Sequence, residues 1–547
     1  MSTRLRVLSF SVVAVIGPAF AFGGAEPTVG AAPVSALSVA EAATAKTTEP
    51  AATAPAATQS GALPEAQALD IAPVWSGHPV GFALLTVGRR QYVAFYDADR
   101  KMTMAARSLD QRQWQMVRLP SVLGWDSHNY VTMAVDAQGH LHVSGNMHCV
   151  PLVYFRTERP GDIESFRPEP AMVGRNEQRC TYPRFLRGPA GELIFTYRDG
   201  RSGNGDQYFN VYDPAARSWR RLIDSPLFSG EGKMNAYFAG PVQDAAGVFH
   251  VCWVWRNTPD CATNHSLCYA RSKDLVRWET SDGRPLALPI TLAKAEVVDP
   301  VPPGGGMING NTRIGFDAQG RPVISYHKYD ADGRTQLYNA RREADGWRIY
   351  QTSKWNYRWQ FEGGGTMRFE IGFGPVVAHA DGSLTQSWRH IKHGSGTWTL
   401  DPQTLQLVAP RKTPAQAGDE NAGGNKSVGE KADGEKAGGE KAGGEKAGGE
   451  RSGAEKTVDN RAVGEKSHSV GAAASRTAPR GRLPKNFHQV ESDWPEMEVR
   501  TAEDLGKPEG GVRYVLRWET LPSNRDRPRP PPLPPPSMLR LYEIGRP

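Results

Sequence analysis

The stretch Asp136-Ala-Gln-Gly139, followed one residue later by Leu141-His-Val-Ser144, joins a tight turn to a strand. Glycine accepts a positive φ, which suits a turn between two antiparallel strands. Apolar and polar residues alternate after the turn, as expected of a strand with one buried face. The stretch therefore predicts the turn and the second strand of a β-hairpin.

The same unit occurs seven times along the chain. Before a long low-complexity tract, its copies are spaced about 50 to 75 residues apart. A period of this length, with strands throughout, is typical of a β-propeller, whose radial repeats leave only short sheet edges. The sequence thus predicts an all-β fold, a seven-bladed β-propeller, with an irregular pair of β-sandwiches as the alternative. The other six copies are Val87-Gly88 with 92–96, Ala190-Gly191 with 193–197, Asp244–Gly247 with 249–253, Asp317–Gly320 with 322–326, Asp381-Gly382 with 384–388 and Gly510-Gly511 with 512–518.

The composition is basic. The 547 residues carry a formal net charge of +7, with a pI near 9.0. This balance agrees with an anionic partner such as an acidic polysaccharide. We expect no nucleic-acid binding, because the basic residues are scattered, and no membrane insertion, because no apolar run reaches the length of a bilayer span. We expect a monomer.

Segments of biased composition divide the chain. Arg4 and Arg6 precede the apolar run Val7–Phe20, and small residues near Ala21 offer a cleavage site, so residues 1–21 are predicted to be a signal peptide. Residues 22–70 and the Gly-, Glu- and Lys-rich residues 410–485 lack apolar periodicity and are predicted to be disordered. The propeller is then expected at 71–409, with a closing blade at 486–547. The signal peptide predicts a periplasmic or secreted protein.

Histidine, tyrosine and arginine residues occur at the ends of consecutive predicted strands. His128 and His148 lie on the second blade, Tyr182 and Arg198 on the third and Tyr237 on the fourth. A propeller presents such strand ends to its central funnel. We therefore expect these five side chains to lie near one another.

These residue types suit β-elimination at a uronic acid. The proton on C5 can leave only if the adjacent carboxylate is neutralised, and arginine is permanently charged and binds carboxylates well. Histidine and tyrosine can serve as the base and the acid. The set indicates a carbon–oxygen lyase, although the same residue types also occur as packing residues in propeller strands.

Longer motifs resemble the BNR repeat-containing family of bacterial exported proteins. The resemblance covers about residues 75–402 and 486–545. Its fold group includes the seven-bladed ulvan lyases, which cleave a sulfated rhamnose–uronate polymer, so the resemblance implies a propeller that acts on a uronate-containing glycan. The motifs are Gly124-Trp-Asp-Ser-His-Asn-Tyr130, Val143-Ser-Gly-Asn-Met-His148, Thr181-Tyr-Pro-Arg-Phe185, Thr196-Tyr-Arg-Asp-Gly200, Trp253-Val-Trp-Arg256, Tyr514–Pro522 and Asn524-Arg-Asp-Arg-Pro528.

The resemblance also implies roles for particular residues. The lyases use two histidines about 20 residues apart, then a tyrosine and an arginine about 16 apart, and this chain matches both spacings. The resemblance implies Arg198 with His148 as the carboxylate neutraliser, Tyr182 with His128 as the acid/base pair and Tyr237 as a further tyrosine. The predicted substrate contacts are Asn129, Asn146, Lys233, Asn235, Arg256 and Trp359.

Some lyases of this fold group contain a structural zinc ion, and one hairpin of this chain has suitable residue types. His250, Cys252, His265 and Cys268 lie within residues 249–269, and Cys180 of the neighbouring blade is a further candidate ligand. Mixed histidine and cysteine ligands suit tetrahedral zinc. The alternatives are buried cysteines beside sheet histidines, or a disulfide between Cys261 and Cys268. No organic cofactor is expected.

Two other functions fit part of the sequence. A sialidase-like or rhamnosidase-like glycoside hydrolase needs two placed carboxylates, for which Glu362 and Glu370 are the candidates. A non-catalytic glycan-binding propeller needs exposed aromatic rings that stack on sugars, for which Trp355 and Trp359 are the candidates. Formation of an unsaturated uronate would distinguish a lyase from both.

Overall fold

The structure is a computed structural model that describes residues 66–408 and 483–545. The predicted signal peptide, the predicted leader up to residue 65 and the low-complexity residues 409–482 lie outside these described residues. Within them, the regular structure consists of 31 β-strands and four short 3-10 helices. No helix in the described ranges has the length and apolar character needed to cross a bilayer.

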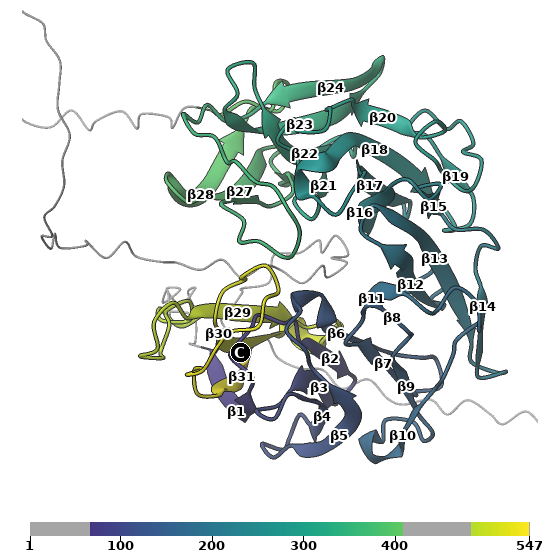
Figure 1. Cartoon of the computed structure of the whole chain (residues 1–547), viewed down its shortest axis with the longest axis vertical. Coiled ribbons are helices and arrows are strands. Elements are labelled where there is room, and N and C mark those ends of the chain that lie inside the picture. Colours follow the sequence, from purple (N-terminus) through teal and green to yellow (C-terminus); the bar gives the residue numbers. More distant parts are fainter. Residues whose placement is uncertain (1–65, 409–482, 546–547) are drawn as a thin grey trace, which may run out of the picture. The chain divides into compact units, whose positions relative to one another are not determined.

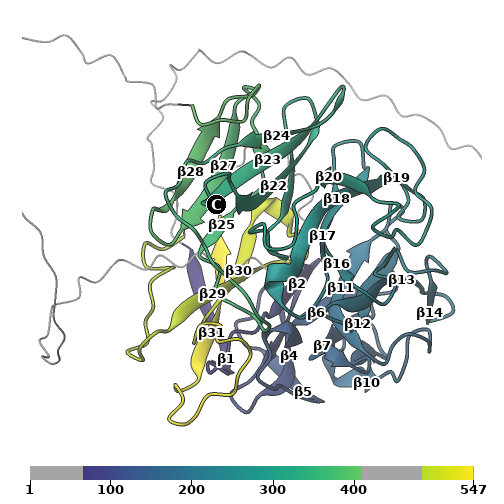
Figure 2. The same cartoon turned by 45° about the horizontal axis from the view of Figure 1, so that its top comes forward.

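The described strands form seven antiparallel sheets (Figures 1 and 2). The sheets comprise β2 (Ala83–Val87), β3 (Arg90–Tyr96), β4 (Lys101–Ser108) and β5 (Gln115–Val122); β6 (Val131–Val135), β7 (Leu141–Gly145), β9 (Tyr154–Thr157) and β10 (Phe166–Pro168); β8 (His148–Val150), β11 (Cys180–Arg187), β12 (Leu193–Arg201), β13 (Asn204–Asp213), β14 (Ser218–Arg221) and β15 (Phe228–Ser229); β16 (Asn235–Gln243), β17 (Phe249–Arg256), β18 (Asn264–Ser272), β19 (Trp278–Glu279) and β20 (Glu296–Asp299); β21 (Arg313–Phe316), β22 (Pro322–Tyr329), β23 (Thr335–Glu343) and β24 (Gly346–Gln351); β25 (Ile371–Phe373), β26 (Val377–Ala378), β27 (Leu384–His390) and β28 (Gly394–Leu400); and β1 (Gln67–Val74), β29 (Glu498–Glu503), β30 (Arg513–Thr520) and β31 (Ser537–Ile544).

The repeated turn-and-strand unit places one strand in each sheet. The seven predicted strands correspond to β3, β7, β12, β17, β22, β27 and β30, and no two of them share a sheet. In the unit that begins at Asp136, the Gly139 N–H donates to the Asp136 carbonyl over 3.1 Å, and the φ of Gly139 is 86°. A Cβ is disfavoured at that φ, which explains why glycine ends this turn.

The last sheet combines strands from both ends of the described chain. β1 pairs with β31, from Gln67 opposite Glu543 to Val74 opposite Ser537, so the purple and yellow strands lie side by side (Figure 1). The propeller therefore begins at Gln67, a few residues before the predicted boundary at 71. The pattern missed the start of β1 because its first residues are largely exposed.

Consecutive sheets pack face to face through apolar side chains. One buried cluster joins Phe209 of β13 to Trp253 of β17, and another joins Val254 of β17 to Ile324 of β22. The strand β2 contacts β6 on one side and β29 on the other. These sheets thus pack against one another in series, as in a β-propeller and unlike a pair of sandwiches. The predicted β-propeller is confirmed.

Candidate active site

A central cavity of about 550 Å³ lies among the inner strands of the propeller. Its walls come from β2, β6, β11, β16 and β29, together with the loops before β21 and β25. Five residues predicted for the site line this cavity: His128, His148, Tyr182, Tyr237 and Arg256. The volume is in the range of small-ligand pockets.

The two histidines share one carboxylate. His128 Nδ1 lies 2.6 Å from Asp126 Oδ1, and His148 Nδ1 is hydrogen-bonded to Asp126 Oδ2. The imidazole rings are stacked, with centroids 4.2 Å apart. Asp126 also caps the 3-10 helix Ser127–Asn129, because Oδ1 accepts the His128 backbone N–H over 2.9 Å. The carboxylate therefore orders both the backbone and the two rings.

Among the described residues, Asp126, His128 and His148 form the group that could hold a metal ion, because their ligand atoms lie within 4.8 Å of one another. Two nitrogen or oxygen ligands of a tetrahedral zinc ion, with bonds of about 2.0 Å, would be roughly 3.3 Å apart. The His128–Asp126 distance of 2.6 Å is instead that of a hydrogen bond. The geometry is that of a carboxylate paired with two imidazoles.

A β-bulge turns Tyr182 into the cavity. The register between β11 and β12 shifts between Thr181 and Arg184, and Tyr182 has a φ of 59°. Bulges commonly redirect a side chain beside an active site, and a positive φ is unusual for a bulky residue. The Tyr182 ring lies 5.5 Å from the His128 ring and 6.0 Å from the Tyr237 ring, between centroids. The proposed acid and base are thus neighbours.

Arg198 lies behind the two tyrosines and not on the cavity wall. Its side chain is 1% exposed, and its guanidinium lies 5.0 Å from the Tyr182 ring centroid and donates to Tyr237 Oη over 3.4 Å. A Cβ at Gly205 would come within 2.9 Å of the Arg198 side chain, so glycine leaves room for it. Arg198 is predicted to neutralise the carboxylate together with His148, and from this position its charge acts from behind the cavity wall. Arg198 can act through the tyrosines.

Burial and these charges move the pKa values of the site residues. Burial raises the pKa of Tyr182 well above its ordinary value, and the opposing charge of Arg198 does not offset this. Burial also acts to raise the pKa of Tyr237, but the charges of Arg198 and Arg256 outweigh it and lower that pKa. Tyr182 therefore keeps its proton more firmly than Tyr237 does, which suits a proton donor.

His148 carries a positive charge at neutral pH. Burial disfavours that charge, but hydrogen bonds to Asp126 and Cys149 outweigh it and raise the pKa of His148 to about 9. For Asp126, burial is likewise outweighed by the two histidines, which hold its pKa far below the usual range. Burial acts to raise the pKa of Cys149, yet His148 and Arg198 lower it to about 7. His148 is the cation that faces the cavity beside His128.

Asp526, from the loop between β30 and β31, joins three distant segments at the edge of the site. Its carboxylate accepts hydrogen bonds from Ser127 N (3.1 Å), Ser127 Oγ (2.9 Å) and Thr366 N (2.6 Å), and lies 3.2 Å from His78 Nε2. Its second oxygen lies 3.8 Å from His128 Nδ1. The last sheet therefore anchors the segment that carries His128.

We expect Asp526→Ala to lower the free energy of unfolding by about 1 to 3 kcal/mol, because it leaves the partly buried backbone N–H groups of Ser127 and Thr366 without their acceptor. Urea unfolding followed by tryptophan fluorescence measures the change. Asp526→Asn, which keeps one acceptor oxygen, is the matched variant and should lose less. Equal stability of the alanine variant and the wild type would show that the loop does not anchor the fold.

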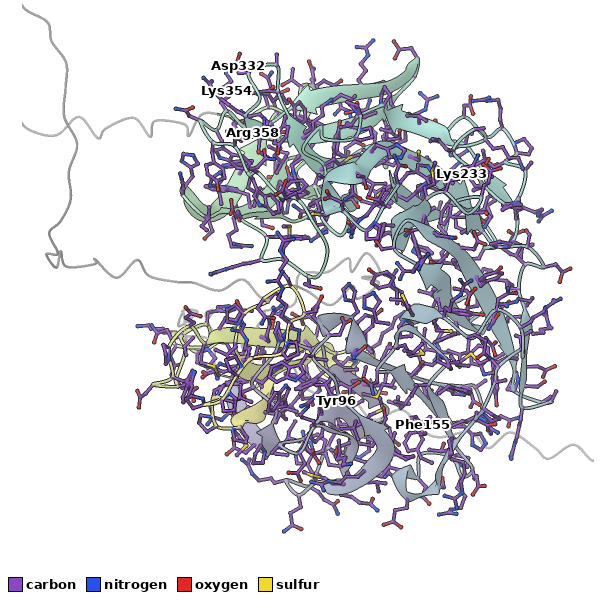
Figure 3. All side chains as sticks on the ribbon, viewed as in Figure 1. Tyr96, Phe155, Lys233, Asp332, Lys354 and Arg358 are labelled. Carbon is purple, nitrogen blue, oxygen red and sulfur yellow. The ribbon has the colours of Figure 1, made fainter. Side chains whose placement is uncertain are left out.

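Several predicted substrate contacts lie away from the cavity. Asn129 and Asn235 are buried, and Asn235 Oδ1 accepts the Gly203 N–H over 2.6 Å. Asn146 donates to Ser121 Oγ over 2.8 Å, on the neighbouring sheet. Lys233 is exposed on a turn outside the cavity lining (Figure 3). These four residues hold loops or face solvent.

The predicted stacking tryptophans are buried. Trp359 is 2% exposed and Trp355 7% exposed, and the Trp359 ring packs against His327 and Phe361. Neither ring can present a face to a sugar in this structure. The prediction of Trp359 as a substrate contact was wrong, because an aromatic residue in a loop can equally belong to the core.

The predicted zinc ligands are not brought together. Cys252 and Cys268 belong to different core clusters, and His250 is engaged by Tyr269 Oη (2.6 Å) and Asp244 (3.1 Å). His265 lies 2.8 Å from the side-chain oxygen of Asn257. All five cysteines are free thiols, so the alternative Cys261–Cys268 disulfide is also absent. Cys268 pairs with Trp253, the strand neighbour of Cys252, and neighbouring positions on a strand point to opposite faces, so the two cysteines lie on opposite faces of the sheet.

The cavity lining contains one carboxylate, Glu503, and Arg513 pairs with it. The hydrolase candidates Glu362 and Glu370 do not line the cavity, and Glu370 is hydrogen-bonded to Tyr357 Oη. A glycoside hydrolase of the usual kind needs two carboxylates on either side of the bond. The described cavity does not provide them.

A family model described as "BNR repeat-containing family member" matches residues 90–355. The predicted family resemblance is confirmed. No curated protein matches the chain. Among solved structures, the chain is similar to an ulvan lyase (15% identity, TM-score 0.43, 62% of this chain and 85% of that chain) and to the polysaccharide lyase Uly1 (12% identity, TM-score 0.49, 85% and 90%). It is also similar to the Aleuria aurantia lectin AAL (14% identity, TM-score 0.28, 63% and 100%).

Sequence reasoning missed Asp126, Cys149 and Asp526. Asp126 has one local signal, since an aspartate two residues before His128 is well placed to cap a helical turn. Cys149 follows His148, but its contact with Arg198 over 3.5 Å joins two strands. Asp526 and His128 are separated by most of the chain, and no local pattern could connect them.

Proposed function

We propose that the protein is a polysaccharide lyase that cleaves uronate-containing glycans by β-elimination. The observation that carries the proposal is the convergence of His128, His148 and Tyr182 on one cavity, beside buried positive charge. This set matches the demands of the reaction, which needs a base, an acid and a neutralised carboxylate. Rhamnose–uronate polymers of the ulvan kind are the first substrates to test.

His148, His128 and Tyr182 each have a role in the proposed elimination. His148, as a cation, neutralises the uronate carboxylate, and the buried charges of Arg198 and Arg256 add positive potential behind it. His128 holds its Nδ1 against Asp126, so Nε2 is the ring nitrogen free to take a proton. His128 removes the proton from C5, and the C–H electron pair forms the C4–C5 double bond. The C4–O4 bond breaks, and Tyr182 gives its proton to O4.

The test is incubation of the purified protein with ulvan, rhamnogalacturonan and gum glucuronans. A lyase yields an unsaturated uronate that absorbs in the ultraviolet and products that are lighter than hydrolysis products by one water. New reducing ends without that chromophore would instead establish hydrolysis, and retention of the glycan without any product would establish a binding protein. Either of the last two results would overturn the proposal.

A further inference from the structure

Asp126 has no step in the proposed reaction, although it contacts both histidines. It does not line the cavity, and its two carboxylate oxygens each face a different imidazole, that of His128 and that of His148. Its side chain is 25% exposed, and it is fixed in place as the cap of the turn Ser127–Asn129. One carboxylate thus controls both rings.

We infer that Asp126 is the positioning residue of the site: it holds both imidazoles with Nδ1–H toward its carboxylate and Nε2 toward the cavity. The inference rests on the proposed function for its catalytic consequence. An ionised carboxylate only accepts hydrogen bonds, so each histidine must place a proton on the nitrogen that faces Asp126.

The same arrangement gives the two histidines different roles, His148 as the cation and His128 as the base. With both Nδ1 atoms protonated, the pair can hold one more proton on one Nε2. Two charged rings with centroids 4.2 Å apart would repel each other, and a single carboxylate compensates one of them. The extra proton belongs to His148, which Cys149 also stabilises. His128 then keeps a lone pair on Nε2 and can act as the base.

Two further groups surround this pair. Asp526 lies 3.8 Å from His128 Nδ1, beyond hydrogen-bond distance, and is held by Ser127 and Thr366. Arg198 contacts Cys149 Sγ over 3.5 Å and so faces His148 only through that thiol. Asp126 is therefore the carboxylate within hydrogen-bond distance of both imidazoles, so it sets the tautomer of both.

The test is Asp126→Asn. An amide has one acceptor oxygen and one donor nitrogen, so it can accept Nδ1–H from only one histidine, and the other must reverse its tautomer. We expect kcat to fall by about 10²-fold or more, because the base would be held in the wrong tautomer, while KM changes little. The basic limb of the pH profile should also move down by at least about one pH unit, because His148 loses its charge partner.

Two variants separate positioning from stability. Asp136→Asn alters another buried carboxylate–histidine pair, in which Asp136 lies 3.4 Å from His142 and neither residue lines the cavity. Whatever its effect on stability, its kcat and pH profile should match the wild type. Asp126→Glu restores a carboxylate and should recover part of the lost kcat.

A second measurement does not depend on activity. Nitrogen NMR of histidine-labelled protein reports the tautomer and the pKa of each imidazole, with His128→Gln and His148→Gln as assignment variants. We expect Nδ1–H on both rings in the wild type and a reversed tautomer in Asp126→Asn. Tautomers that do not respond to Asp126→Asn would overturn the inference even if the lyase reaction is found. Absence of lyase activity with the expected tautomers would overturn only the proposed function.

Discussion

His128→Ala is expected to lower the rate of elimination by about 10²- to 10⁴-fold, the range lost when a general base is removed. The ring lines the cavity, and its Nδ1 is held by Asp126 over 2.6 Å, so its Nε2 is the best placed nitrogen for proton removal. Initial rates of ultraviolet absorbance on the active glycan measure the effect. Substrate binding should persist, because His148 and the buried arginines remain.

The matched control for this variant is His379→Ala. His379 is exposed on a turn of another sheet, and its ring bonds only Thr385 in the described structure, over 2.7 Å. Its kcat should equal that of the wild type. A His128→Ala protein that folds and keeps more than about a tenth of the wild-type rate would remove His128 from the role of base.

Tyr182→Phe is the second variant with a large expected effect. Burial keeps the pKa of Tyr182 well above its ordinary value, so the phenol reaches the cavity in its protonated form. Loss of its hydroxyl should lower kcat by about 10²-fold or more on a natural glycan, whose leaving oxygen needs a proton. The ring itself remains, so the bulge in β11 and the packing against His128 should survive.

A synthetic substrate sharpens this test. A uronate that carries a nitrophenyl group at O4 has a leaving group that departs without a proton. It should restore most of the rate of Tyr182→Phe and none of the rate of His128→Ala. Tyr92→Phe, which removes a hydroxyl bonded to the Gly161 carbonyl in a different sheet, is the control. Equal losses of the Tyr182 variant on both substrates would mean that Tyr182 is not the acid.

The fold could be predicted because its signal is local and repeated. Each unit, such as Asp136–Gly139 with its strand, carries its own turn and its own alternation of apolar residues, and repetition made the propeller recognisable. The pairing of β1 with β31 could not be predicted in the same way. The two strands lie at opposite ends of the chain, and nothing in either strand alone specifies its partner.

The candidate site was predicted in part. His128, His148, Tyr182 and Tyr237 were recognised from spacing and resemblance, and all four line the cavity. Arg198 was also recognised, but its burial behind the cavity wall was not predicted. The sequence does not show whether a side chain at a strand end lines a cavity or is buried behind it. The predicted zinc ligands are separated because Cys252 and Cys268 lie on opposite faces of their sheet, and Trp359 is buried because its loop packs into the core.

By itself, the sequence determined which segments become strands, where hairpins turn and which residue types are available for chemistry, because these follow from alternation, glycine positions and composition. Only the tertiary structure decided which side chains share a cavity and which carboxylate controls them. The shared hydrogen bonds of Asp126 and the reach of Asp526 to Ser127 and Thr366 depend on strands from separate sheets. Burial and electrostatic interactions depend on the distance between groups in space, and the separation of two residues along the chain does not give that distance.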